Sequence, residues 1–177
     1  MDTFKIDVTG DDLFSKNAGV IIEYSNSGEP FVYAFKFSSD LQSKIRDNFN
    51  AKLYCLDNKK ILKPRIYCAI LVLIFEQILR EHAVNTEKYI MNFCRDFDGH
   101  EQNIINILNQ HFSNKILFEA LTADKYYFVK HPKKSLIQRS AEHVYRGEWE
   151  GIIKVVLNPN DIHNLIAKPK CRKNKWR

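Results

Sequence analysis

FKIDVTGDDLFSKNAGVIIEY, residues 4–24, contains two apolar strands joined by a turn with the sequence Thr-Gly-Asp-Asp. The segment FVYAFKF, residues 31–37, is equally rich in aromatic and β-branched residues, and the turn SNSGEP precedes it. Three strands in direct succession, at residues 3–8, 18–25 and 31–37, predict an antiparallel meander. Asp7 stands out because it places a carboxylate inside an otherwise apolar strand. It either caps the turn or binds a metal ion.

Helical and strand-like segments alternate in the remainder of the chain. One helix is predicted from Ser39, where serines offer an N-cap, and a second from Pro64 through residue 82. The second helix is apolar on nearly all sides, so it must be buried. The remaining predicted elements are a strand at 88–96, a helix at 100–112, a strand at 115–121 with 126–129 extending it or forming another strand, and a helix at 134–147 ended by Gly147. This order predicts an α/β fold with a mixed sheet covered by helices on both faces.

Length and hydropathy favour a single domain, which we assign to residues 1–167 of the 177. The longest apolar run, residues 66–75, is about half of the roughly 20 residues that a membrane-spanning helix requires, so no membrane association is expected. The N-terminus has neither the basic nor the apolar region of a signal peptide, which predicts a cytoplasmic protein. The four cysteines form no C-x-x-C pair, and each is expected to be a reduced thiol.

The net charge of +6 is concentrated at the C-terminus. The last ten residues, KPKCRKNKWR, hold six basic side chains and no acidic one. Removing these six from the 27 Lys and Arg residues leaves 21, which equals the number of Asp and Glu residues. The body is therefore neutral, and residues 168–177 are expected to form a disordered basic tail. Such a tail either adds non-specific affinity for nucleic acid, through residues such as Lys173 and Lys175, or only solubilises the chain.

Acidic residues recur on separate predicted elements. Glu76 emerges from the apolar helix, and Glu142 lies on the last predicted helix. Asp96 and Asp98 lie at the end of the fourth predicted strand. Carboxylates that converge repel one another unless cations neutralise them, and Mg²⁺ is a cation suited to oxygen ligands. Each acid also has a purely structural alternative, as a cap, as an ion-pair partner of a neighbouring turn, or as a solvated side chain.

Two short motifs add a resemblance to a known family. The opening Ile6-Asp7-Val8-Thr9-Gly10-Asp11 is similar to the Asp-x-Ser-Gly-Asp start of a large group of uncharacterised prokaryotic proteins in the ribonuclease H-like superfamily. The segment Gln138-Arg139-Ser140-Ala141-Glu142 is similar to their late-helix motif of Gln, small residues and Ala-Asp, with Glu142 where that group has Asp. The order of three antiparallel strands, helix, parallel strand, helix, strand and final helix also resembles this superfamily.

The resemblance implies a set of site residues. Asp7, Asp11 and Glu142 correspond by motif, whereas Glu76 and Asp96 or Asp98 correspond by their position in the order of elements. The implied metal ligands for Mg²⁺ or Mn²⁺ are Asp7, Glu76, Asp96, Asp98 and Glu142. Several superfamily members keep a mobile His before the last helix, and His131 lies at that place.

A local basic cluster lies beside His131 in the sequence, at Lys130, Lys133, Lys134 and Arg139. These side chains either hold a backbone phosphate or are a solvated helix start. Together with these residues, the resemblance implies a Mg²⁺-dependent nuclease that hydrolyses RNA or DNA phosphodiesters by a two-metal mechanism. The alternative is a catalytically inactive ribonuclease H-like module that binds nucleic acid or a protein partner, which the neutral body favours.

Overall fold

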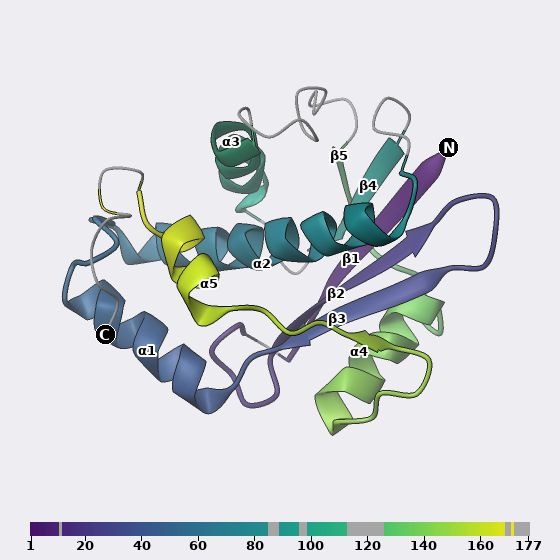
Figure 1. The fold of residues 1–177 in the computed structure, drawn as a ribbon, viewed down its shortest axis with the longest axis horizontal. Coiled ribbons are helices and arrows are strands. Elements are labelled where there is room, and N and C mark those ends of the chain that lie inside the picture. Colours follow the sequence, from purple (N-terminus) through teal and green to yellow (C-terminus); the bar gives the residue numbers. More distant parts are fainter. Residues whose placement is uncertain (11, 85–88, 96–98, 113–125, 169–170, 172–177) are drawn as a thin grey trace.

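A six-stranded mixed sheet forms the frame of the molecule (Figure 1). The computed structural model describes residues 1–10, 12–84, 89–95, 99–112, 126–168 and 171. The sheet has the spatial order β5-β4-β1-β2-β3-β6. Its strands are β1 (Asp2–Thr9), β2 (Gly19–Ser25), β3 (Phe31–Lys36), β4 (Tyr89–Cys94), β5 (Tyr126–Val129) and β6 (Ile153–Lys154). The first three strands pair antiparallel, whereas β4 pairs parallel with β1 and β5 parallel with β4. The predicted meander and the mixed α/β sheet are thus confirmed.

The central strand β1 divides its side chains between two environments because successive residues of a strand point to opposite faces. Phe4 and Ile6 belong to the larger of two hydrophobic cores. Lys5 and Asp7 contact partners on the other side, and Lys5 Nζ lies 2.5 Å from Glu23 Oε1 on the neighbouring strand. Ile6 pairs with Phe93 of β4, so β4 ends beside the C-terminal part of β1.

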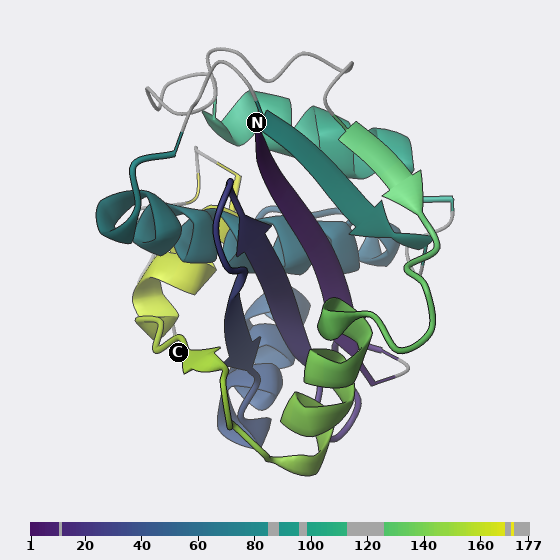
Figure 2. The same cartoon turned by 90° about the vertical axis from the view of Figure 1, so that its right-hand side faces the viewer.

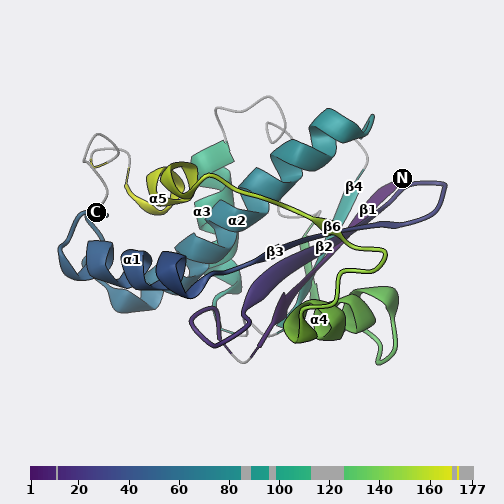
Figure 3. The same cartoon turned by 60° about the horizontal axis from the view of Figure 1, so that its bottom comes forward.

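Helices cover both faces of the sheet, as predicted (Figures 1 and 3). The larger core receives buried side chains from α1 (Ser39–Asn50), α2 (Lys59–Glu81), α3 (Glu101–Phe112) and α5 (Pro159–Ile166). On the opposite face, α4 (Leu136–Arg146) lies alone among the helices that the structure describes, in front of the sheet in Figure 2. It contributes to a smaller core made of Ile21, Val32, Ala34, Ile137 and Val144.

Helix α2 begins earlier than the sequence pattern predicts. Pro64 lies inside the helix rather than at its start, and the helix begins at Lys59 because the side chain of Asn58 accepts a hydrogen bond from the Lys60 N–H and caps it. Burial of the nearly continuous apolar surface is confirmed, with residues such as Ile66 and Ile70 almost fully buried. None of the helices in the described ranges has the length and hydropathy needed to cross a membrane.

The C-terminal region contains features that the sequence pattern does not predict. Strand β6 has only two residues and α5 only eight, so neither shows a clear periodicity. Cys55 and Cys171 form a disulfide across 116 residues of sequence, with a Cα–Cα distance of 6.2 Å. The prediction of reduced thiols is therefore wrong for this pair, whereas Cys68 and Cys94 are free and buried.

The beginning of the predicted basic tail contacts the body of the protein. Lys168, the first residue of the predicted tail, donates its N–H to the Tyr54 carbonyl, and its Nζ lies 3.5 Å from Asp57 Oδ2. With the disulfide at Cys171, these contacts hold the beginning of the predicted tail against the body. The predicted strand at 115–121 lies outside the described residues, as do Lys173 and Lys175.

A buried polar pair fixes α5 in the larger core. The Tyr54 hydroxyl lies 2.5 Å from His163 Nδ1, and both side chains are almost completely buried. Burial, with a smaller effect of the Lys44 charge, lowers the pKa of His163 from 6.5 to about 4. Because the charged imidazolium is disfavoured at this place, His163 is neutral in the folded protein at neutral pH.

This lowered pKa predicts a pH-dependent stability. The unfolded chain gains a proton at His163 below about pH 6.5, whereas the folded protein does not until about pH 4. We therefore expect this residue to reduce the free energy of unfolding by about 3 kcal/mol between pH 7.5 and pH 4. Urea unfolding across that range measures the loss. His163→Gln serves as the control because Gln does not titrate, and an identical pH dependence in wild type and variant would contradict the assignment.

Candidate functional site

A cavity of about 450 Å³ lies between the C-terminal end of β1 and one face of α4. We call it the Asp7 cavity. Strand β1 and the start of the following turn contribute residues 7–10, and the helix contributes Gln138, Ala141, Glu142, Tyr145 and Arg146. Gln138, Ala141, Glu142 and Tyr145 recur at the spacing that places helical residues on one face. One side of α4 therefore forms a wall of the cavity.

The opposite side of α4 explains its position. Ile137, Ser140 and Val144 are buried, and the two apolar ones pack on Ile21 and other residues of the smaller core. Gly147 ends the helix in the left-handed conformation, with φ of 86°, and its N–H bonds back to the Val144 carbonyl. Because apolar residues hold one side against the sheet, the polar residues of the other side are presented to the cavity.

Asp7 is the most buried acidic residue of this cavity, with 1% of its surface exposed. Its Oδ2 accepts a hydrogen bond of 2.6 Å from Gln138 Nε2, and its Oδ1 accepts one of 2.9 Å from the Val8 N–H. Both carboxylate oxygens therefore have a donor. A buried carboxylate without donors would be costly, so the amide of Gln138 stabilises Asp7 at this position and also orients it.

His131 forms a second link between the α4 region and β1. It is buried, and its Nε2 lies 3.1 Å from the Ile6 carbonyl oxygen, to which it donates. Ile6 directly precedes Asp7 in β1. His131 and Gln138, which lie seven positions apart in the chain, therefore bind two neighbouring residues of the same strand. His131 does not line the Asp7 cavity. This geometry suits a positioning residue, in contrast to the mobile His expected from the sequence.

The structure brings together some of the predicted acidic residues and separates others. Asp7 and Glu142 line the same cavity, and Glu142 is exposed. Glu76 does not line it, because it lies on α2, which packs on the face of the sheet opposite α4. The predicted convergence of Glu76 with Asp7 is therefore not observed. Asp96 and Asp98, like Asp11, lie outside the described residues.

The donor set of the Asp7 cavity suits a hard cation. Mg²⁺ binds proteins through one or two carboxylates and keeps several waters, and the lining of the cavity offers two carboxylates, those of Asp7 and Glu142. No group of three or more His, Cys, Asp or Glu side chains that could hold a metal occurs in the described ranges. Those ranges therefore do not supply the ligands that a pair of metal ions would need.

Basic residues lie at both ends of α4. Lys130, Lys133, Lys134 and Arg139 of the predicted cluster are all exposed, before the helix and in its first turns. Arg146, at the other end, lines the Asp7 cavity together with the half-exposed Tyr145. Sequence reasoning missed these two residues, although the helical spacing that continues from Gln138 through Glu142 leads to Tyr145.

The contact between Asp7 and Gln138 predicts the outcome of a charge exchange. Gln138→Glu places two carboxylates in direct contact, so we expect a loss of about 2 kcal/mol or more in the free energy of unfolding at pH 8. The double variant Asp7→Asn with Gln138→Glu restores one donor and one acceptor, and it should return to within about 1 kcal/mol of wild type. Urea unfolding measures both values. Glu142→Gln is the matched control, with an expected change within about 0.5 kcal/mol because Glu142 is exposed. Failure of the second substitution to rescue the first would contradict the contact.

Comparison with known proteins identifies no relative of this chain. It matches no protein-family model, and neither a curated protein nor a solved structure shows significant similarity to it. The function must therefore be inferred from the residues of the chain and from their geometry.

Proposed function

We propose that this protein is a ribonuclease H-like nuclease that uses Mg²⁺ or Mn²⁺ at the Asp7 cavity to hydrolyse phosphodiester bonds of RNA or DNA. The observation that carries the proposal is the hydrogen bond between Asp7 and Gln138. These residues are separated by 131 positions, and they belong to the two motifs on which the family resemblance rests. Their meeting in one cavity, with Glu142 on the same wall, supports a shared site.

The arrangement of elements supports the ribonuclease H-like part of the proposal. The superfamily pattern begins with three antiparallel strands, which have their counterparts in β1, β2 and β3. The later strands β4 and β5 run parallel to β1, and α4 follows them on the opposite face of the sheet from α2. In this pattern the first strand and a late helix after the parallel strands carry metal-binding acids. Asp7 lies on β1 and Glu142 on α4, which is followed in this chain by β6 and α5.

The chemistry follows from the residues of the cavity. Asp7 and Glu142 would hold Mg²⁺, which, when bound, neutralises their charges and stabilises the negative charge that develops on the phosphodiester. Gln138 keeps the Asp7 carboxylate in one orientation through its amide hydrogen bond. Arg146 offers a guanidinium at the same cavity, where it suits a phosphate oxygen. A two-metal mechanism would require further ligands from outside the described residues. Asp11, Asp96 and Asp98 are acidic residues outside the described ranges.

Other exposed residues suit nucleic acid as the substrate. Lys130, Lys133 and Lys134 lie just before α4, and Arg139 follows in its first turns. Side chains of this kind contact backbone phosphates without reading sequence. Tyr145 is 45% exposed at the cavity and provides a ring on which a base can stack.

Two observations favour the second candidate, an inactive ribonuclease H-like module that binds nucleic acid or a protein partner. Both oxygens of Asp7 already accept hydrogen bonds within the protein, and Glu76 lies on the other face of the sheet. A protein with these two properties keeps the fold but offers fewer metal ligands than the set that the resemblance implies. The two candidates differ in whether metal binding and cleavage occur at all.

Metal-dependent cleavage tests the proposal directly. Labelled single-stranded RNA, duplex DNA and an RNA/DNA hybrid are incubated with the protein and Mg²⁺ or Mn²⁺. We expect cleavage of at least one substrate, and a reduction of about 100-fold or more in Asp7→Asn because it removes a ligand charge from the cavity. Glu142→Gln should also reduce the rate. Glu76→Gln is the matched control, and its rate should stay close to wild type because Glu76 lies away from the cavity.

Thermal unfolding with and without the two metals separates the candidates. Stabilisation of wild type but not of Asp7→Asn supports the metal site, since a ligand that binds only the folded state raises its stability. No cleavage together with no stabilisation would overturn the nuclease and favour the binding module. Loss of cleavage in Glu76→Gln as large as in Asp7→Asn would contradict the location of the site.

A further inference from the structure

A second cavity, of about 350 Å³, lies on the other side of the connection between β1 and β2. Asp12 and Phe14 of this connection form one wall, α1 contributes Arg46 and Phe49, and the first turns of α2 contribute Lys59 and Lys63. We call it the Arg46 pocket. Its volume lies in the range of small-molecule sites.

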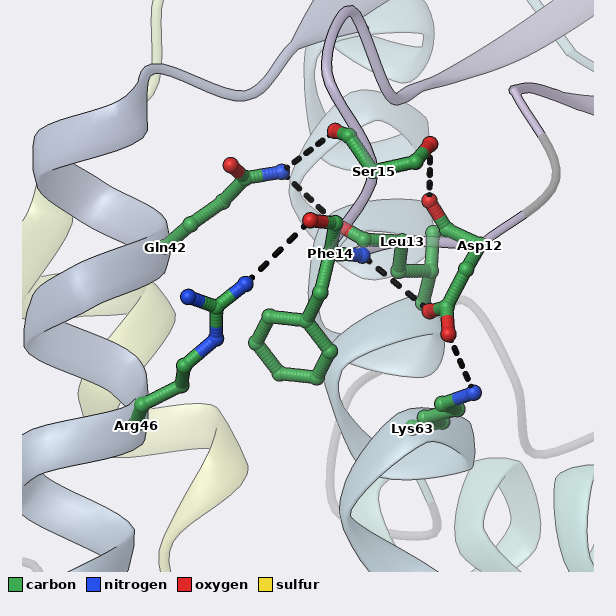
Figure 4. Close-up of polar contacts among 7 residues, drawn as sticks. All are labelled: Asp12, Leu13, Phe14, Ser15, Gln42, Arg46 and Lys63. Carbon is green, nitrogen blue, oxygen red and sulfur yellow. Dashed lines mark hydrogen bonds and ion pairs between the residues drawn. The ribbon is translucent and has the colours of Figure 1, made fainter.

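The wall made by the connection is fixed by hydrogen bonds (Figure 4). Gln42 of α1 donates its side-chain amide to the carbonyl oxygens of Leu13 and Ser15, at 2.9 and 3.0 Å. The Phe14 N–H bonds to Asp12 Oδ1 at 3.1 Å, and the Ser15 hydroxyl donates to the Asp12 carbonyl oxygen at 2.6 Å. The pocket is therefore largely formed before any ligand arrives, which lowers the entropic cost of binding.

The charges of the Arg46 pocket are predominantly positive. Asp12 is its acidic residue, and its Oδ2 lies 2.5 Å from Lys63 Nζ. Burial alone would raise the pKa of Asp12, but the hydrogen bonds from Lys63 and the Phe14 N–H, with the charges of Lys63 and Arg46, lower it overall. Lys63 is thus paired with an ionised carboxylate. Among the residues that the structure describes, neither Arg46 nor Lys59 forms an ion pair, although the charge of Arg46 acts on Asp12.

Arg46 is held in position to contact a ligand. Its guanidinium donates one hydrogen bond of 3.2 Å to the Phe14 carbonyl and lies 4.9 Å from the centre of the Phe14 ring. A guanidinium has five N–H donors, so most of them remain for an anion. Phe14 and Phe49 are only partly buried, which leaves apolar ring surface at the same pocket as the cations.

The start of α2 breaks a local rule in a way that points to the same pocket. Lys59, Lys60 and Lys63 lie in its first turns, and its first turn contains no acidic residue. Cations at a helix N-terminus oppose the helix dipole, so this sequence weakens the helix end locally. Local choices that conflict with stability are expected where a residue serves a function, and two of these lysines line the pocket.

We propose that the Arg46 pocket binds a nucleotide, with the phosphate contacted by Arg46 and Lys59 and the base packed on the exposed surface of Phe14 or Phe49. Cations and rings together select this ligand over inorganic phosphate, which has no base, and over a nucleoside, which has no charge. The nucleotide is either free or one residue of a single strand, and both present the same chemistry. The proposal depends on this pocket alone and not on hydrolysis at the Asp7 cavity.

Binding without divalent metal tests the proposal separately from any nuclease activity. Calorimetric titrations in EDTA use the full chain with AMP, adenosine, inorganic phosphate and a single-stranded octamer of adenosine nucleotides. We expect AMP to bind more tightly than adenosine and phosphate, and Lys59→Ala and Arg46→Gln to weaken AMP binding about tenfold or more. Lys60→Ala is the matched control, since it removes the same charge from the same turn but does not line the pocket.

Each outcome decides between the alternatives. An octamer that binds more tightly than AMP assigns the pocket to a residue of a nucleic acid strand, and equal affinities assign it to a free nucleotide. The proposal is overturned if Lys60→Ala weakens AMP binding as much as Lys59→Ala, or if phosphate or adenosine alone binds as tightly as AMP. Amide chemical shifts establish that each variant is folded, so that weaker binding reflects the lost side chain. An absence of AMP binding in the folded wild type also overturns the proposal.

Discussion

Asp7 lies in the middle of the sheet on the central strand, and its carboxylate is nearly inaccessible to solvent. A charge in that position requires donors, and Gln138, on a helix far along the chain, supplies a side-chain donor. The buried hydrogen bond between them fixes α4 against β1 more specifically than apolar packing does, because an amide and a carboxylate must meet at one register. The position of every other polar residue on α4 follows from that register.

The connection between β1 and β2 separates two cavities of different character. Gly10 lines the Asp7 cavity, while Asp12 and Phe14 line the Arg46 pocket. Gly10 has a φ of 78°, and a Cβ atom at this residue would lie 2.5 Å from Ser15 Oγ, so the turn requires glycine. One short segment therefore contributes both to a cavity with two carboxylates and to a pocket with an excess of cations.

Net charge gives an incomplete picture of this surface. Counting residues predicts a neutral body with a basic tail, yet the body carries a local excess of positive charge at the Arg46 pocket and around the start of α4. Acidic residues elsewhere balance these groups in number but not in position. A ligand responds to the charges within about one Debye length of its site, so the local arrangement matters more than the total.

The sequence by itself determined the local elements. Alternating β-branched and aromatic residues specify the meander, the apolar run of α2 specifies a buried helix, and Gly147 specifies the end of α4. The same patterns single out Asp7 as a carboxylate in an apolar strand, because a window of a few residues contains that information. These patterns do not predict α5 or β6, because both elements are too short to show a periodicity.

Only the tertiary structure decided which distant residues meet. Whether Glu76 or Glu142 joins Asp7 depends on which face of the sheet each helix covers, and both helices carry acidic residues that satisfy local patterns equally well. The pairing of Cys55 with Cys171 depends likewise on where α5 packs, over a separation of 116 residues. Such contacts are set by the packing of whole elements around the sheet, and packing is a property of the complete chain rather than of any short segment.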